Sequence, residues 1–180
     1  DKTGTLTKAQ PTVAKVVSFN GGSEDELLKI AACLEEHFPH SMARAVVEAA
    51  KNRGIEHSEM HSKVEYIVAH GIASAIGDKR VVIGSAHFVF EDEKATIPED
   101  KHTLYEELPL ESSHLYLAID GVLAAVICIE DPVREEAVEV IRKLKAAGIS
   151  KVVMMTGDSE RTAAAIAKKV GVDEYYSEVL

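Results

Sequence analysis

The chain has 180 residues, of which 46% are hydrophobic, 28% charged and 5% aromatic. This is the composition of an ordinary globular protein, and it excludes a disordered tail, a collagen-like fibre and a disulfide-stapled mini-protein. The net charge of -10 argues against a general nucleic-acid binder and against a basic protein of the membrane surface. The longest apolar stretch, residues 122–129, is far shorter than the roughly 20 residues that span a bilayer.

The first third of the chain predicts one strand and two helices. Residues 13–19 are rich in β-branched side chains and end at an Asn-Gly-Gly turn, which is typical of a strand. Ser23 and Glu26 have the spacing of a capping box, so a helix is expected to start there. A second helix is expected from Ser41, with Gly54 as its end.

The middle of the chain predicts an antiparallel sheet. Between the last strands, Asp120 and Gly121 form a strong two-residue hairpin signal. Residues 91–101 are acidic and polar, and we expect a solvated loop that leads to a short helix near 102–108. The β-rich pattern begins at residue 64 and runs to residue 89 before that loop. The expected strands are residues 64–68, 72–76, 80–83, 114–119 and 122–129.

The last third alternates between helix and strand. Asp131 is expected to cap a helix that begins with a proline and buries Val140 and Leu144. A short apolar strand at 151–155 and a helix at 160–170 follow. This order favours a parallel α/β layer, so the chain as a whole is of the α/β class.

The first seven residues, DKTGTLT, carry the strongest chemical signal. A carboxylate such as that of Asp1 attacks a phosphoryl group only when its charge is offset and the phosphate oxygens are held. Lys2 adds positive charge, and Thr3 with the neighbouring glycine and hydroxyl residues supplies N–H and O–H donors. The alternative is a solvated polar terminus with a cap-like aspartate.

Thr156, Gly157 and Asp158 lie between an expected strand and the start of an expected helix. A hydroxyl, a glycine backbone and a helix N-terminus converge there, which is where α/β folds bind phosphate. By itself the triplet is a weak signal, because it also serves as an ordinary turn and helix cap. Together with Asp1 it predicts a phosphate site built from both ends of the chain.

These motifs are similar to those of one known family. Residues 1–7 match the phosphorylation motif of P-type ATPases, and residues 156–158 match the T-G-D turn of the same family. Residues 131–134, DPVR, resemble its D-P-x-R element, although a plain helix start explains Arg134 equally well.

The middle of the chain resembles the heavy-metal-transporting members of that family. Residues 34–43 look like the region around their S-E-H-P-x-A element. Glu35 and His40 take the places of the Glu and His that lie at the adenine of ATP, while Ser41 stands where the proline should be. A histidine on a loop before a helix has the means to stack on a purine or hydrogen-bond to it.

Two glycine elements extend the resemblance. Gly71 and Ile72 fall in a segment similar to the family's G-x-G-[IV]-x-A nucleotide loop, with Ala69 in place of the first glycine. Gly84 and Ser85 match its G-N element, with serine in place of asparagine. These departures indicate a divergent branch of the family.

The resemblance implies a fold and a division into domains. It implies a partial parallel α/β phosphorylation domain of haloacid-dehalogenase-like type, with an inserted α+β nucleotide-binding domain built on an antiparallel sheet. We expect the phosphorylation domain at residues 1–19 and 126–180 and the nucleotide-binding domain at residues 20–125.

The resemblance also implies a chemistry, with ATP and Mg²⁺ as cofactors. Asp1 would attack the γ-phosphate and become an aspartyl phosphate, Lys2 and Thr156 would help to hold the phosphoryl group, and Thr3, Gly157 and Asp158 would complete the catalytic set. Asp1 and Thr3 would contact the metal ion. The nucleotide would be bound by Glu35, His40, Gly71, Ile72, Gly84 and Ser85.

The resemblance implies a place in a larger protein. The chain would be a cytoplasmic domain of an integral membrane pump, with the membrane helices and actuator domain of that pump as its partners. It would neither bind nucleic acid nor insert into the membrane itself. The chain begins at Asp1 without methionine and has no G-D-G-x-N-D motif, so we expect a fragment that is inactive by itself.

Two alternatives from other classes stay open. A soluble phosphatase of the same superfamily usually carries a second aspartate two residues after the nucleophile. Here that position is Thr3, which suits a long-lived phosphoenzyme better. A non-catalytic nucleotide-binding module is the other alternative. The transported ion is not encoded in this segment, because ion choice belongs to membrane helices.

Overall fold

The computed structural model describes residues 1–36, 38, 40–56, 65–67 and 71–179. The expected strand ends Val64 and Val68 and the loop residue Ala69 lie outside the described residues. No helix in the described part of the chain is long and apolar enough to cross a membrane.

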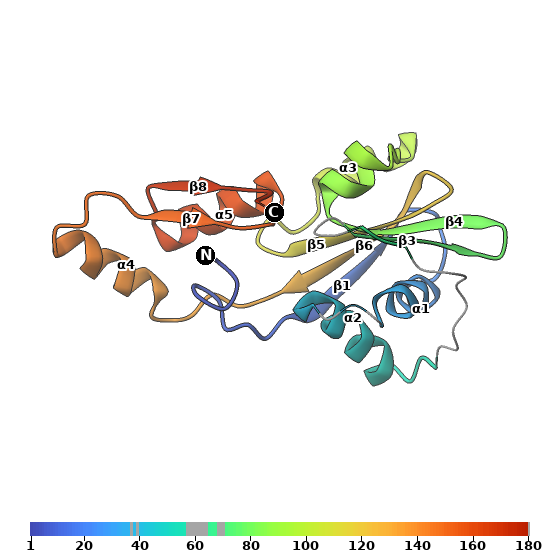
Figure 1. Ribbon diagram of the computed structural model, residues 1–180, viewed down its shortest axis with the longest axis horizontal. Coiled ribbons are helices and arrows are strands. Elements are labelled where there is room, and N and C mark those ends of the chain that lie inside the picture. Colours follow the sequence, from blue (N-terminus) through green and yellow to red (C-terminus); the bar gives the residue numbers. More distant parts are fainter. Residues whose placement is uncertain (37, 39, 57–64, 68–70, 180) are drawn as a thin grey trace.

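The elements form two bodies that lie end to end along the long axis of the molecule (Figure 1). The larger body contains a six-stranded sheet in the order β1-β6-β5-β4-β3-β2, in which every neighbouring pair is antiparallel. Its elements are β1 (Thr12–Ser18), α1 (Glu24–Glu35), α2 (Ser41–Asn52), β2 (Glu65–Ile67), β3 (Gly71–Ile76), β4 (Lys79–Gly84), the π-helical η1 (His87–Asp92), the 3-10 turn η2 (Glu99–Lys101), α3 (His102–Glu106), β5 (Ser113–Ile119) and β6 (Val122–Glu130).

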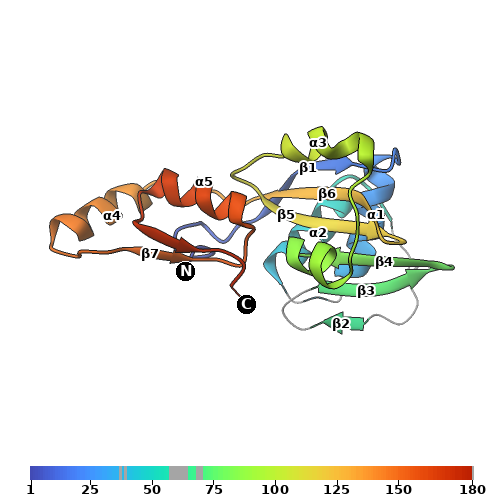
Figure 2. The same ribbon diagram turned by 90° about the horizontal axis from the view of Figure 1, so that it is seen from above.

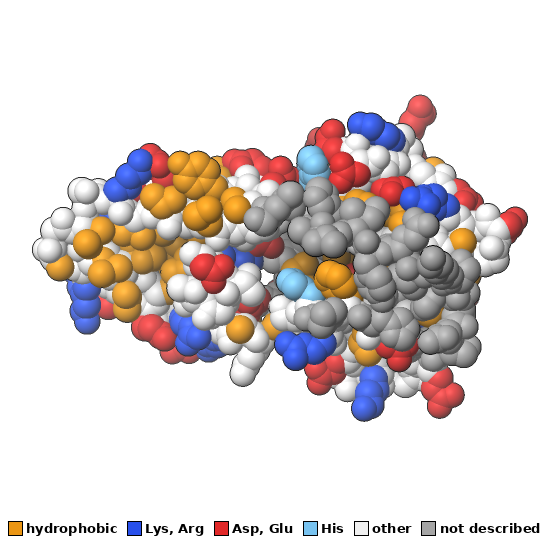
Figure 3. Space-filling view, in the orientation of Figure 1, with side chains coloured by type: hydrophobic (Ala, Val, Ile, Leu, Met, Phe, Trp, Pro, Cys, Tyr) orange, Lys and Arg blue, Asp and Glu red, His pale blue; other side chains and the backbone are white. Residues whose placement is uncertain are grey.

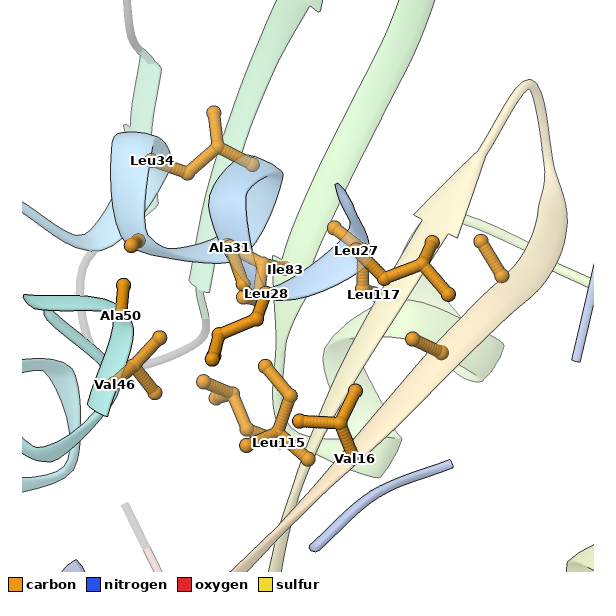
Figure 4. Packing of buried hydrophobic residues seen from close by; sticks show 14 of the residues in the cluster. Val16, Leu27, Leu28, Ala31, Leu34, Val46, Ala50, Ile83, Leu115 and Leu117 are labelled. Atoms are coloured by element: carbon orange, nitrogen blue, oxygen red, sulfur yellow. The ribbon is translucent and has the colours of Figure 1, made fainter. Parts of the chain in front are cut away.

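The sheet of the larger body is covered on both faces. Helices α1 and α2 lie on one face, and η1 with α3 lies on the other (Figure 1). Successive residues of a strand point to opposite faces, so Leu115 and Leu117 of β5 pack against α1 and α2, while Tyr116 packs on the other side. Figure 4 shows Leu28 of α1 and Val46 of α2 among the buried hydrophobic side chains on this helix-covered face of the sheet. The expected antiparallel sheet with helices is confirmed.

Local signals set the ends of these elements. The hydroxyl of Ser23 accepts a hydrogen bond of 3.2 Å from the backbone N–H of Glu26, so the expected cap opens α1. Gly54 has a φ of +67° just beyond α2. Asp120 and Gly121 have φ values of +50° and +76° between β5 and β6, as a tight hairpin turn of this kind requires.

The smaller body is a two-stranded parallel sheet with helices on one side (Figure 2). Met154 of the sheet packs with Ile166 and Val170 of the helix that follows it, and with Ile141. The expected strand–turn–helix order is therefore present. The elements are α4 (Ala137–Ala146), β7 (Val153–Met155), α5 (Glu160–Val170) and β8 (Glu174–Tyr176).

Three expectations for single elements are wrong. Helix α4 begins only at Ala137, because the carboxylate of Asp131 is used elsewhere and caps no helix. Val140 and Leu144 are exposed, since α4 buries only a narrow face and no other described element covers the rest. Hydrophobic side chains accordingly gather on the surface over β7, β8 and α4 (Figure 3). Residues 87–92 form a π-helix rather than a β-rich piece and a loop.

The chain passes twice between the two bodies. Strand β1 pairs with residues 125–130 of β6, and both strands belong to the six-stranded sheet. The two crossings therefore lie near residues 10 and 131.

Candidate active site

A cleft of about 420 Å³ lies between the two bodies and gathers residues from both ends and the middle of the chain. Eleven of the twelve site residues expected from the sequence line it. They are Asp1, Thr3, Glu35, His40, Gly71, Ile72, Gly84, Ser85, Thr156, Gly157 and Asp158. The exception is Lys2, which is buried just behind the cleft with only 4% of its surface exposed.

Asp1 is held by a tight loop of residues 1–7. One carboxylate oxygen of Asp1 accepts a hydrogen bond of 2.8 Å from the hydroxyl of Thr5. The backbone N–H of Lys2 donates to the carbonyl of Met155 at 3.1 Å, so the loop runs beside β7. Gly4 turns the loop with a φ of +81°. A carboxylate is thereby presented at one end of the cleft.

The loop is fastened to the second crossing between the bodies. The hydroxyl of Thr7 donates to Asp131 at 2.5 Å, and the guanidinium of Arg134 donates to the carbonyl oxygen of Thr5 at 3.1 Å and to that of Gly4 at 3.4 Å. The segment that begins with Asp131 therefore holds the loop from behind. Arg134 has a structural role beyond a helix start, which the sequence left open.

The ammonium of Lys2 lies between two partners from different bodies. It forms an ion pair with the carboxylate of Asp158, and it donates a hydrogen bond of 3.2 Å to the hydroxyl of Ser113. Burial pushes the pKa of Asp158 upward, but the charge of Lys2 and hydrogen bonds from Lys2, Ser113 and Thr156 outweigh burial and lower the pKa. Asp158 is therefore ionised at neutral pH and fixes Lys2.

The turn at residues 156–158 stands at the start of α5. The hydroxyl of Thr156 donates to the carboxylate of Asp158 at 2.8 Å and accepts from the backbone N–H of Asp158 at 3.2 Å. The carbonyl of Thr156 accepts from the N–H of Val179, and that of Asp158 accepts from Glu178. These bonds hold a hydroxyl and backbone groups beside a helix N-terminus, where anions are stabilised.

The opposite end of the cleft is formed by α1 and α2. Glu35 is 5% exposed, and burial raises the pKa of its carboxyl from 4.5 to about 7. His40 is the N-cap of α2, where its Nδ1 accepts a hydrogen bond of 3.3 Å from the N–H of Met42. The ring of Phe38 lies 6.2 Å from that of His40, centroid to centroid. This end offers a buried carboxyl, the half-buried ring of Phe38 and the exposed ring of His40.

The floor between the two ends is made by β3 and β4. Gly71 and Gly84 face each other across the two strands. A Cβ atom on Gly71 would lie 2.3 Å from Cδ1 of Phe88 and 2.5 Å from the carbonyl oxygen of Ile83. Glycine is therefore required at 71 for packing. The hydroxyl of Ser85 accepts from the N–H of Phe88 at 3.2 Å and so starts the π-helix.

Sequence reasoning missed the contribution of β5. His114 and Tyr116 line the cleft, and Nδ1 of His114 lies 3.4 Å from the hydroxyl of Tyr116. Burial lowers the pKa of His114, which stays neutral at pH 7. The available signal was two polar aromatic residues in an otherwise apolar strand. The other lining residues that the sequence did not suggest are Phe38, Met42, Ala43, Ala86, Leu115, Ser159 and Val179.

The cleft has the chemistry for binding a phosphorylated ligand next to a carboxylate. No three Asp, Glu, His or Cys side chains of the described residues form a metal cage. Magnesium is commonly bound by one or two carboxylates together with substrate phosphates, and this mode needs no such cage. Asp1, with Thr3 beside it in the same cleft, fits that mode.

Comparisons with known proteins give a consistent assignment. A family model described as haloacid dehalogenase-like hydrolase matches residues 1–180. Copper-transporting ATPase 2 of Rhizobium meliloti is 39% identical over the whole chain, which covers 21% of that protein. The silver exporting P-type ATPase of Salmonella typhimurium is 35% identical, again over the whole chain and 22% of its own length. The chain thus spans about a fifth of these two curated relatives.

Solved structures agree with the sequence relatives. The catalytic domain of the CPx-ATPase CopB-B, in a study of conformational changes upon nucleotide binding, has a TM-score of 0.72 and 26% identity over 99% of this chain and 59% of that one. A zinc-transporting PIB-type ATPase in the E2.Pi state has a TM-score of 0.63 and 32% identity over 100% of this chain and 28% of that one. The resemblance to heavy-metal-transporting P-type ATPases expected from the motifs is confirmed.

Proposed function

The chain belongs to the haloacid dehalogenase-like hydrolases, and from this premise we propose that it is the ATP-binding and phosphorylation region of a heavy-metal-transporting P-type ATPase. One observation carries the proposal. A single cleft brings Asp1 and the turn at 156–158 together with Glu35 and His40, although these residues come from both ends and the middle of the chain. Such a cleft suits a ligand with a base at one end and a phosphate chain at the other.

The proposed reaction is an in-line phosphoryl transfer. A carboxylate oxygen of Asp1 attacks the γ-phosphorus of ATP, the bond to the β,γ-bridging oxygen breaks, and ADP leaves with that electron pair. The resulting acyl phosphate is later hydrolysed by water. Thr156 holds the phosphoryl oxygens, Gly157 and Asp158 shape the turn around them, and Lys2 supports that turn from behind the cleft through its ion pair with Asp158. Magnesium, when bound by Asp1 and Thr3, supplies positive charge to the phosphate oxygens.

The nucleotide end of the cleft binds the base and sugar of ATP. Glu35 and His40 contact the adenine, while Gly71, Ile72, Gly84 and Ser85 form the surface on which the nucleotide lies. Sheet membership favours a nucleotide-binding domain of about residues 12–130, with the phosphorylation domain formed by the two flanking segments. The remainder of the pump, including membrane helices, would place this region on the cytoplasmic side.

The relatives support a pump over a soluble phosphatase. Their printed names cover copper, silver, zinc and manganese, so the ion carried here is left open. Thr3 stands where a soluble phosphatase usually has a second aspartate, and the phosphoenzyme therefore lacks that general acid.

Labelling with [γ-³²P]ATP tests the proposal directly. The whole gene product that carries these 180 residues should form an acid-stable, hydroxylamine-sensitive phosphoenzyme in the presence of magnesium. Asp1→Asn should abolish the label, whereas the control Asp78→Asn, in the exposed turn between β3 and β4, should keep it. Label that persists in Asp1→Asn would show that another residue is phosphorylated.

A further inference from the structure

Ser113, the first residue of β5, makes a side-chain contact across the two bodies. Its hydroxyl accepts a hydrogen bond of 3.2 Å from Nζ of Lys2, which is 111 residues away in the chain. Both residues are buried, with 6% of Ser113 and 4% of Lys2 exposed. The bond is thus shielded from water, where losing a hydrogen-bond partner of an ammonium group is unfavourable because no water replaces it.

The contact is one residue from the proposed nucleophile. The other partner of the Lys2 ammonium is the carboxylate of Asp158, which belongs to the smaller body. The backbone N–H of Lys2 is bonded to Met155 of the same body. Among the described residues, Ser113 is therefore the group of the larger body whose side chain bonds to Lys2.

The segment that precedes Ser113 is docked onto α5. The guanidinium of Arg161 donates to the carbonyls of Tyr105 at 3.1 Å and Glu106 at 2.6 Å. The buried hydroxyl of Thr162 donates to the carbonyl of Ser112 at 3.0 Å. These bonds fix the position of the start of β5 relative to the smaller body, and they bring the Ser113 hydroxyl to Lys2.

We propose that Ser113 is a positioning residue for phosphoryl transfer, because it ties the Lys2 side chain to the body that binds the nucleotide. This inference rests on the proposed function of the cleft. The nucleotide is bound by the larger body and Asp1 belongs to the smaller one, so their separation depends on how the bodies meet. Lysine has a flexible four-carbon side chain. When the larger body holds the ammonium group of Lys2, the neighbouring backbone of Asp1 is held at a fixed position relative to the phosphate chain of the nucleotide.

The proposal predicts that loss of the Ser113 hydroxyl slows the chemical step but leaves the affinity for ATP almost unchanged. Ser113→Ala should slow phosphoenzyme formation at saturating ATP about tenfold, the change expected when one hydrogen bond to a charged group is lost. The affinity for ATP should change less than about twofold, because the Ser113 hydroxyl faces Lys2 and not the nucleotide. Ser113→Thr, which keeps the hydroxyl, should restore the rate to within about twofold.

The experiment uses rapid-quench labelling of the whole gene product, with Ser112→Ala as the matched control. Ser112 is also buried, and its alanine variant keeps the carbonyl that Thr162 contacts. Lys2→Met gives a second arm, since Ser113→Ala should slow the reaction less in that background than in the wild type, where its bond to Lys2 is present. If Ser113→Ala fails to fold, Ser113→Cys takes its place, and the same results are expected of it.

The outcomes are separable. A Ser113→Ala enzyme that labels at the wild-type rate overturns the inference and leaves the proposed function standing. So does a variant whose rate and ATP affinity fall together and whose threonine form gives no rescue, because that result indicates only a structural role. Absence of label in the wild type, or label that survives Asp1→Asn, refutes the proposed function, and the inference falls with it.

Discussion

The hydroxyl of Thr7 and the carboxylate of Asp131 are joined by a hydrogen bond of 2.5 Å across 124 residues of sequence. The second oxygen of the same carboxylate accepts from the backbone N–H of Gln10 at 3.1 Å. Asp131 therefore closes the loop that carries Asp1 onto the end of β6. Thr7 is 1% exposed, so the pair is shielded from water on one side.

Asp131→Ala should lower the free energy of unfolding by about 1–3 kcal/mol, because it leaves a buried hydroxyl and an N–H without their acceptor. Thr7→Val should lower the free energy of unfolding by a smaller amount. The effect of the double variant should differ from the sum of the two single effects, because the two side chains contact each other. Urea denaturation followed by circular dichroism measures all three. The control is Glu135→Ala, a highly exposed carboxylate whose pair with Lys8 is 3.8 Å long, and it should change stability by less than about 0.5 kcal/mol. Equal losses in the free energy of unfolding for Asp131→Ala and Glu135→Ala would contradict the role of Asp131 in holding the loop.

Glu35 should make the protein less stable as the pH rises. Its folded-state pKa of about 7 lies above the ordinary value of 4.5. Below pH 4.5 the carboxyl is protonated in both states, and no penalty arises. Between pH 4.5 and 7 the unfolded chain releases its proton first, so stability falls over that window by about 3 kcal/mol at most.

Glu35→Gln should remove this pH dependence and be more stable than the wild type at pH 8, but not at pH 4. The exposed Glu26 of the same helix gives the control variant Glu26→Gln, which should keep the wild-type slope. Parallel stability curves for the wild type and Glu35→Gln from pH 4 to pH 8 would show that the carboxyl is not shifted by burial.

His40→Ala should weaken ATP binding to the 180-residue chain by about 1–3 kcal/mol, the typical effect of losing one hydrogen-bonding or stacking partner. Calorimetric titration measures the affinity. His102→Ala is the matched control, because His102 is exposed at the start of α3 and does not line the cleft. Wild-type protein should also prefer ATP to GTP, and equal affinities would refute a pocket that reads the base.

Gly71→Ala should destabilise the fold by more than about 1–3 kcal/mol, the usual cost of overpacking a core. The added Cβ would meet both Phe88 and the backbone of Ile83 below 3.0 Å. Gly157→Ala is the control, since its Cβ would meet nothing closer than 3.5 Å. Thermal denaturation separates the two variants. A stable Gly71→Ala protein that has lost only nucleotide affinity would assign Gly71 to the ligand and not to packing.

Much of the larger body could be predicted because its signals are local. Ser23 caps α1, Gly54 follows α2 and Asp120-Gly121 turns the hairpin, and each acts within a few residues of its own position. The helix expected at Asp131 was wrong because a distant residue, Thr7, uses that carboxylate. A pattern read along one segment contains no information about such a partner.

The site was predictable where a short motif carries it. DKTGTLT, T-G-D, the segment around Glu35 and His40, and the two glycine elements together identified eleven lining residues, because each motif has a recognisable spacing. His114 at the cleft and Ser113 beside Lys2 were missed because both positions depend on how β5 meets the smaller body. The exposed side chains of Val140 and Leu144 were missed for a related reason, since a helical apolar stripe predicts a buried face but not the element that covers it.

One nucleotide should span the cleft from Glu35 and His40 to the turn at 156–158. Amide chemical shifts of the isotope-labelled 180-residue chain, followed during titration with a non-hydrolysable ATP analogue, test it most directly. The amide signals of Ser85 in the larger body and Gly157 in the smaller one should shift together, with a single dissociation constant. Shifts confined to one body, or two different dissociation constants, would contradict a shared site.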